Sequence, residues 1–487
     1  MAKANTVNAD SFRNSNIIQL LSLFTREEKA EFGKFVHSPF NSRSEVARFF
    51  DELKKYFPSF QKKTFSRENI YKALYPGVKY RDDVIRKLSS NLFKLAEDYI
   101  AYKMFREDEY EQKKRVLDYY SFKFDHSFFK KHAEKTEAYL KGQPSRNAEY
   151  YHRLKELNTV KASHLSKYDS TRKKFDNTQE RIEQAWQHTV IALLSIYDAA
   201  LNDMMYFNKK YNVDLLKPLL EIYNNPVFIK SAAAEAYYYS LKLNTDERND
   251  DTFYALKNLL EKNSDIFTKE ELFGFYTGMH NYLFEKGLAP DPDTSKLEFE
   301  VGIKMLELGL ITEGNTISAE WFANVFLKAV KANEIKYAEK FIEEYKMMLS
   351  EKERDNIVNY AYAELEFAKN NYQKALEHLA KVKFNNVWEK LRINHMYTKI
   401  HYDMNNSESF YYIIDSFRHI IKDEYSVNDY VKKLHENFIR YVTPLFRLKN
   451  GDTNVSLPKI KKEVLNFNAA GNKWLLDKVA ELEKAKK

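Results

Sequence analysis

A two-helix pattern is written three times between Ile317 and Lys422, and this repetition constrains the fold more than any other feature of the chain. In the middle copy, an apolar-rich helix over 359–369 is followed by the turn Asn370-Asn371 and by a second helix. The apolar residues of that second helix recur at i, i+3, i+4, i+7 and i+10, namely Tyr372, Ala375, Leu376, Leu379 and Val382. This spacing marks one face of a helix, which is stable only when a neighbouring element buries it. The pattern therefore predicts stacked helix pairs.

The three copies match position by position. Ala338, Ala375 and Phe410 occupy the same place, with spacings of 37 and 35 residues, and an Asn-containing turn precedes each of them. This arrangement resembles the tetratricopeptide family of helical repeats, whose period is about 34 residues. The resemblance is clearest over about 105 residues and extends upstream to Pro226. The sequence departs from the family's pattern in two ways. The third copy carries Ser407 and Phe410 at the last two matching positions, and Asn replaces the family's turn glycine in the first two copies.

Breaker residues are scarce along the whole chain. Glycine occurs 11 times and proline 10 times in 487 residues, about 2% each against a typical 7% and 5%. No series of alternating apolar runs bounded by turn residues is present, so we predict an all-α fold. A chain of this length exceeds one hydrophobic core. We predict an N-terminal helical domain followed by an α-α superhelix of antiparallel helix pairs, divided into an N-terminal helical domain (1–105), a long-helix middle segment (106–225), helical-pair repeats (226–447) and C-terminal capping helices (448–487).

Cysteine is absent, which excludes disulfides, thiolate zinc sites and cysteine nucleophiles. The stretch from Met1 to Asn14 is polar, and no later run reaches the roughly 18 apolar residues that a membrane span needs. We therefore expect a cytoplasmic protein with no membrane span.

The first 200 residues carry 37 basic and 27 acidic side chains, an excess of ten positive charges within a chain of net charge +8. Within them, the runs Ser66–Asn69, Ala73–Gly77 and Ile85–Leu95 resemble the recognition region of winged-helix regulators. The resemblance implies phosphate contacts from Lys79, Arg81, Arg86 and Lys87. It departs from the family because the chain continues as helix to Phe105 where a wing should follow. The alternative is that these cations lie on the solvated side of a helix whose other side carries Leu88 and Leu92.

Motifs for catalysis and for metal or cofactor binding are missing from the sequence. It contains no phosphate-binding or dinucleotide glycine loop, no His-Glu-x-x-His and no Gly-x-Ser-x-Gly. We predict no catalytic residues, no metal site and no cofactor, and hence a binding function.

The resemblance to tetratricopeptide repeats implies where a partner binds. In that family the partner lies in a concave groove lined by the first helix of each pair. The matching residues, each trio spaced i, i+4, i+7 on one helix face, are Tyr360, Glu364 and Phe367 in the middle copy and His395, Lys399 and Tyr402 in the third. The alternative is that Tyr360 and Phe367 belong to the core.

Two hypotheses of function follow. The first is a non-enzymatic helical-repeat scaffold or adaptor that binds a protein or peptide partner through this groove. The second is a nucleic-acid-binding regulator with a basic N-terminal helical domain and a repeat domain that senses a partner. Both leave the oligomeric state open.

Overall fold

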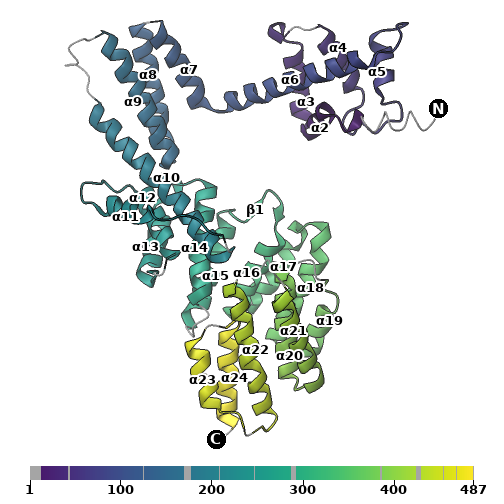
Figure 1. Cartoon of the computed structure of the whole chain (residues 1–487), viewed down its shortest axis with the longest axis vertical. Helices are drawn as coiled ribbons and strands as arrows, with labels where there is room; N and C mark the ends of the chain where they lie inside the picture. Colours follow the sequence, from purple (N-terminus) through teal and green to yellow (C-terminus); the bar gives the residue numbers. More distant parts are fainter. Residues whose placement is uncertain are drawn as a thin grey trace. The chain divides into compact units, whose positions relative to one another are not determined.

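The predicted all-α class is confirmed by the computed structural model (Figure 1), in which a single short hairpin interrupts the helices among the described residues. The chain divides into two compact units, Met1–Leu140 and Lys141–Lys487. The four-part division expected from the sequence stays a prediction. The described residues are 12–41, 44–123, 125–168, 177–207, 209–245, 247–286, 292–383, 387–423, 429–452, 454–467 and 469–485.

The first unit is built on one long helix, α6. Its residues Leu88 and Leu92 are buried, as expected from the sequence, and α2 to α5 pack against it. The helices of this unit are α2 (Asn16–Leu23), α3 (Arg26–Val36), α4 (Ser44–Lys54), α5 (Arg67–Leu74), α6 (Asp82–Glu107), α7 (Glu109–Phe122) and α8 (His126–Gly142), with the 3-10 turn η1 (Pro39–Asn41).

The start of α3 shows how the sequence sets a helix boundary. The Glu28 amide donates to the Thr25 hydroxyl at 3.1 Å, and the Thr25 amide donates to the Glu28 carboxylate at 2.8 Å. This reciprocal capping box satisfies two amides that otherwise have no partner within the helix. The helix accordingly begins at Arg26, directly after this cap.

The second unit consists of consecutive helices that pack mainly on their neighbours in sequence. They are α9 (Ala148–Tyr168), α10 (Thr178–Tyr206), α11 (Leu216–Asn224), α12 (Ala232–Leu243), α13 (Asp250–Asn263), α14 (Lys269–Lys286), α15 (Pro292–Glu307), α16 (Ala319–Lys331), α17 (Ile335–Tyr345), α18 (Glu351–Ala368), α19 (Tyr372–Leu379), α20 (Val387–Asp403), α21 (Ser407–Asp423), α22 (Asp429–Lys449), α23 (Leu457–Asn466) and α24 (Asn472–Ala485), with 3-10 turns η2 (Ser264–Ile266) and η3 (Lys346–Met348). A hairpin that the sequence did not predict, β1 (Thr312–Glu313) with β2 (Thr316–Ile317), joins α15 to α16. Its two-residue strands are too short to show an alternating pattern.

The three predicted helix pairs, α16/α17, α18/α19 and α20/α21, share one turn geometry. Asn333, Asn370 and Asn405 have φ values of 62°, 61° and 56°. Asparagine tolerates this left-handed conformation better than most residues, which explains how it replaces glycine here. In every pair the next amide donates to a carbonyl five residues earlier: Glu334 to Ala329 at 2.8 Å, Asn371 to Glu366 at 2.8 Å and Asn406 to His401 at 3.0 Å.

The same helix ending occurs on both sides of the three copies, with glycine in the left-handed position. The Leu310 amide donates to Met305 at 2.9 Å after α15, and the Asp452 amide donates to Arg447 at 3.1 Å after α22. Since α16 packs on both α17 and α18, and α20 on α21, the packing is compatible with the expected repeat superhelix.

Candidate functional site

The predicted groove residues of the middle copy lie on α18, and the structure buries one of them. Tyr360 packs among Ala363, Ile393 and Met396. Its hydroxyl donates to Oε1 of Glu364 at 2.7 Å, and burial raises the pKa of this tyrosine well above its usual value. Phe367 is half-buried, with its ring centroid 5.8 Å from that of Tyr372. The interpretation of Tyr360 as a core residue, left open by the sequence, matches its burial.

The predicted groove residues of the third copy lie on α20 under the chain's own last segment. The Tyr402 ring is buried, with its centroid 5.1 Å from the Trp474 ring of α24. His395 Nε2 donates to the Ala470 carbonyl at 3.2 Å, and Lys399 Nζ lies 5.9 Å from the Trp474 ring centroid. The expectation of an open groove at these residues therefore needs correction, because α24 and the segment before it cover this face.

The close approach of that segment depends on Gly471. Its φ is +74°, and a Cβ atom at this position would lie 2.7 Å from Cε1 of His395. The helix α24 that follows is held to α20 by an ion pair, since Lys478 Nζ lies 2.7 Å from the Asp403 carboxylate and both side chains are largely buried. The sequence predicted α24 only as a closing helix, and its contact with α20 joins residues about 75 positions apart.

His395 and Lys399 nevertheless keep part of their surface exposed. Burial lowers the pKa of both groups, and charge repulsion between Lys399 and His395 lowers the pKa of His395 further. Of the three predicted residues on α20, His395 and Lys399 are thus partly exposed, and Tyr402 is buried.

A cluster of polar side chains that the sequence did not predict, most of them largely buried, lies beside this face of α20, on α14, α15 and α16. Among the described residues, the Lys328 ammonium, the Thr277 hydroxyl and both ring nitrogens of His280 are buried without a hydrogen-bond partner. Burial lowers the pKa of Lys328 to about 7 and that of His280 to about 3. We call Thr277, His280, Glu298, Lys328 and Lys331 the Lys328 cluster.

Packing brings the members of the Lys328 cluster together. A Cβ atom at Gly302 would lie 3.4 Å from Cδ of Lys328, so the absence of a side chain there leaves room for the lysine stem. Glu298 stands one turn before Gly302 on α15 and is buried, and Lys331 Nζ lies 3.8 Å from its carboxylate. Trp321 links α16 to α14, with its ring centroid 5.9 Å from that of His280.

The Lys328 cluster can bind a polar group. Lys328 supplies hydrogen-bond donors, a neutral His280 supplies one donor and one acceptor, and Glu298 supplies acceptors. A buried group that stays unpaired costs about 1–3 kcal/mol, so a bound partner that pairs these atoms would stabilise the fold. The sequence held one signal for this cluster: Lys328 lies seven residues after Trp321, on the side of α16 whose other buried residues are all apolar.

The cations predicted for nucleic acid lie on the first unit. Arg81 Nη2 is 2.5 Å from Asp83 Oδ2, and Arg86 Nε is 2.6 Å from Asp82 Oδ2. Lys79 and Lys87 are exposed. No strand occurs in the described part of this unit, so the winged-helix resemblance has no wing there. Phosphate binding by these four residues stays a prediction.

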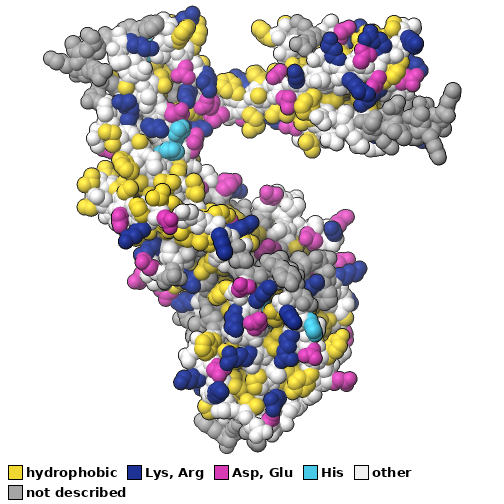
Figure 2. Space-filling model, in the orientation of Figure 1, with side chains coloured by type: hydrophobic (Ala, Val, Ile, Leu, Met, Phe, Trp, Pro, Cys, Tyr) yellow, Lys and Arg dark blue, Asp and Glu magenta, His cyan; other side chains and the backbone are white. Residues whose placement is uncertain are grey.

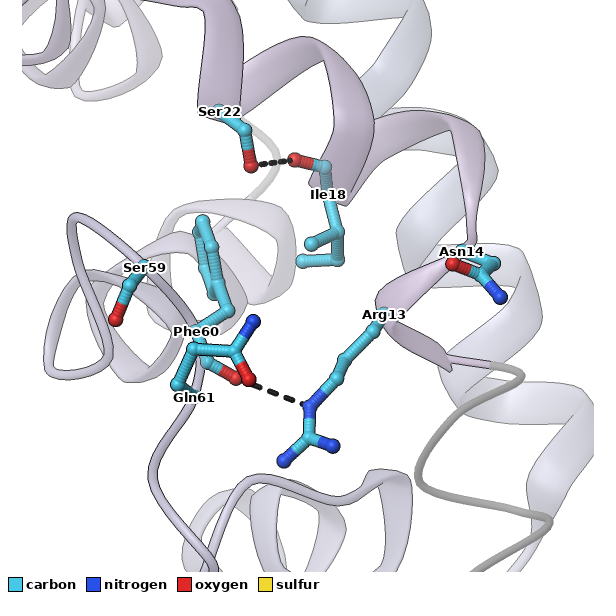
Figure 3. A pocket seen from close by; sticks show the side chains of 7 residues that line it. All are labelled: Arg13, Asn14, Ile18, Ser22, Ser59, Phe60 and Gln61. Atoms are coloured by element: carbon cyan, nitrogen blue, oxygen red, sulfur yellow. Dashed lines mark hydrogen bonds between the residues drawn. The ribbon is translucent and has the colours of Figure 1, made fainter.

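A pocket of about 320 Å³ lies in the same unit, between α2 and the turn at Phe60 (Figure 3). The Arg13 side chain donates from Nε to the Phe60 carbonyl at 3.2 Å, and Ser22 donates to the Ile18 carbonyl at 2.7 Å. Phe60 has a φ of 54°. The arginine and the serine thus bond to the backbone around the pocket, and the arginine has a structural role in holding this turn.

No protein-family model, curated protein or solved structure matches the chain. The helices of the described residues include none that is long and apolar enough to cross a bilayer. The same residues hold no group of three or more His, Asp or Glu side chains arranged to bind a metal. Function is therefore argued from the geometry of the second unit.

Proposed function

We propose that this chain is a non-enzymatic helical-repeat scaffold, of the tetratricopeptide-like type, that binds a segment of a protein partner at the Lys328 cluster. The observation that carries the proposal is the buried Lys328 ammonium without a hydrogen-bond partner among the described residues. Burying an ammonium group without a hydrogen-bond partner costs free energy. A hydrogen-bond acceptor on another molecule that pairs with Lys328 offsets this cost, which favours binding at this position.

The surroundings of the Lys328 cluster favour a peptide segment of mixed polarity. Lys331 is exposed, while Glu364 and Lys399 are partly exposed on the neighbouring helices α18 and α20. Burial is the main cause of the low pKa of His280 and of His395, and charge repulsion from Lys331 lowers both pKa values further. Lys331 is therefore close enough to influence both the Lys328 cluster and the predicted groove face. A short polypeptide can place acceptors at Lys328 and its own donors at Glu364 at the same time.

The experiment compares Lys328→Met with Lys340→Met. Both substitutions remove an ammonium group and keep an unbranched side chain, but Lys340 lies exposed on α17. Partners captured by the wild-type chain from its native lysate are first identified by mass spectrometry. Calorimetric titration of the purified partner then gives the affinity for each variant, and circular dichroism checks that each variant is folded.

We expect Lys328→Met to weaken binding by about 10–100-fold, which corresponds to one lost hydrogen bond to a charged group. Lys340→Met should bind as the wild type does. Equal affinities for the two variants would show that the partner does not use the Lys328 cluster, and the proposal would then be wrong.

A further inference from the structure

The largest helix of the second unit, α10, carries a row of exposed apolar side chains. Ile182, Trp186, Leu193 and Ile196 have exposed fractions of 47%, 46%, 38% and 63%. Thr189 lies between them and is also exposed. We call Ile182, Trp186, Thr189, Leu193 and Ile196 the α10 stripe. In Figure 2, hydrophobic side chains gather on the surface over the region of α10, α11 and α12.

The α10 stripe is separate from the side of α10 that builds the fold. Val190, Ile191 and Leu194 are buried, and the helix packs against α9 and α12. At 100° per residue, Ile191 points about 180°, Leu194 about 120° and Val190 about 80° from the middle of the stripe. Burial of the domain core therefore does not explain why the stripe is apolar.

The spacing of the α10 stripe is that of a coiled-coil seam. Its residues follow one another at intervals of 4, 3, 4 and 3 positions, which keeps a row of side chains facing a second helix along its length. Such a row on an unpaired helix is typical of a surface that another helix covers.

The α10 stripe is also complementary to itself. When two copies of α10 run antiparallel about an axis beside Ile191, Trp186 of each lies opposite Ile196 of the other, and Leu193 lies opposite Thr189. Ile182 then lies opposite Ala200. The layers of Trp186 with Ile196 and of Leu193 with Thr189 each pair two members of the stripe, and each layer occurs twice, as a two-fold interface requires. We propose that two copies of this chain associate through the α10 stripe, antiparallel and in this register.

Small residues and charges favour this arrangement. Ala185, Ala192 and Ala199 recur every seven positions along one border of the stripe, and side chains of this size let a second backbone come close. The stripe itself carries no charge. A parallel pair would bring Glu183 next to its own copy, whereas the antiparallel pair sets Glu183 opposite Ala199.

The four large side chains of the stripe supply about half of the area that a standard-size interface buries. With about 200 Å² for a fully exposed large side chain, the four large residues of the stripe expose on the order of 400 Å² in each copy. Two copies bury about twice that from these side chains alone, and the residues between and beside them add more. An exposed apolar row of this size is comparable to the largest patch on a typical monomer, and such patches are often functional.

The first test measures the mass of the full chain in solution by sedimentation equilibrium. We expect the wild type to have twice the chain mass of 57.9 kDa. Ile196→Glu should give the single-chain mass, because it places a carboxylate against Trp186 of the other copy. Tyr412→Glu is the matched control, since Tyr412 is a 76% exposed aromatic residue on α21, and it should remain dimeric.

The second test uses the absence of cysteine from the chain. In the proposed register Ala192 lies opposite Val190 of the other copy, so the two Ala192 positions lie on the same border of the interface close to the two-fold axis. Ala192→Cys should therefore be joined to its copy by a short bis-maleimide cross-linker. Lys459→Cys, at an exposed position on α23, should cross-link far more slowly. The rate is read from denaturing electrophoresis, and circular dichroism checks that both variants are folded.

Three outcomes would overturn the proposal. These are a wild-type chain that is monomeric at every accessible concentration, a dimer that survives Ile196→Glu, and a dimer in which Ala192→Cys cross-links no faster than Lys459→Cys. A monomeric wild type would indicate that a different protein covers the α10 stripe.

Discussion

The Trp474 ring of α24 meets the Tyr402 ring of α20 nearly edge-on, with centroids 5.1 Å apart and planes at 75°. Edge-to-face pairs of this kind add about 0.5–1.5 kcal/mol beyond the burial of their area. Trp474 also lies under the Lys399 and Lys478 ammonium groups. This one side chain therefore holds the last helix against the inner face of the third helix pair.

We predict that Trp474→Ala lowers the free energy of unfolding of the second unit by about 3 kcal/mol, the lower end of the range for removing a large aromatic residue, because Trp474 keeps some exposure. Urea denaturation followed by circular dichroism measures the change. Lys473→Ala, at the exposed neighbouring position, should change the free energy by less than about 0.5 kcal/mol. Similar losses for the two variants would mean that the tryptophan does not anchor α24.

The left-handed turn residue Asn333 gives a second prediction. Asn333→Gly should leave the stability equal or slightly higher, since glycine adopts a φ of 62° without strain. Asn333→Val should cost about 1–2 kcal/mol, because a β-branched side chain clashes in this conformation. Thermal unfolding separates the two variants. Glu334→Val is the control at the next position, where φ is −87°, and a loss as large as that of Asn333→Val would contradict the explanation.

Much of the fold could be predicted from the sequence, because the signals that set it are local. Thr25 with Glu28 marks the start of a helix within four residues, and the Asn370 turn marks the reversal of a helix pair. Leu88 and Leu92 show the buried side of α6 through their spacing alone. Each of these features is decided by residues that are neighbours in the chain, so a pattern along the sequence is enough to find it.

The candidate site could not be predicted in the same way, because its contacts join distant residues. His395 meets Ala470 across 75 positions, and no spacing rule connects them. Lys328 and His280 are 48 positions apart and approach only when α14 and α16 pack. Helical periodicity identified which side of α20 faces inward, but it could not show that the chain's own last helix covers that side.

A third prediction concerns pH and the buried carboxyl group of Asp198. Burial raises the pKa of Asp198 to about 6, although hydrogen bonds from Ser240 at 2.8 Å and Asn244 at 2.7 Å oppose this shift. The unfolded chain has a pKa near 4 at this residue. The folded state thus binds more protons between about pH 4 and pH 6, so this group's contribution to stability is full below about pH 4 and is lost as the pH rises to about 6.

The substitution Asp198→Asn should remove the loss of stability that the Asp198 carboxyl group causes as the pH rises. An amide has almost the same shape, can accept from Asn244 and can donate to the Ser240 hydroxyl. We expect the variant to be more stable than the wild type at pH 7, by up to about 3 kcal/mol, and to lose this advantage near pH 4. Urea denaturation at the two pH values measures the difference. Asp251→Asn, at an exposed position on α13, should show no such pH-dependent gain.

A fourth prediction tests the nucleic-acid hypothesis through the salt dependence of binding. Of the four cations predicted to contact phosphate, Arg81 and Arg86 form ion pairs with Asp83 and Asp82. Lys79 and Lys87 are exposed, and we expect these two lysines to neutralise phosphate. Each phosphate contact on duplex DNA contributes about −0.9 to the slope of log affinity against log salt concentration. We therefore expect weak binding with a slope no steeper than about −2.

Fluorescence anisotropy with a labelled duplex, between about 50 and 200 mM salt, measures this slope. Lys79→Gln combined with Lys87→Gln should abolish the binding, whereas Lys34→Gln combined with Lys63→Gln, which removes two other exposed lysines of the same unit, should not. A slope of about −5 or steeper would require more phosphate contacts than these lysines can make. Such a slope, or binding that survives loss of Lys79 and Lys87, would place any nucleic-acid surface elsewhere on the chain.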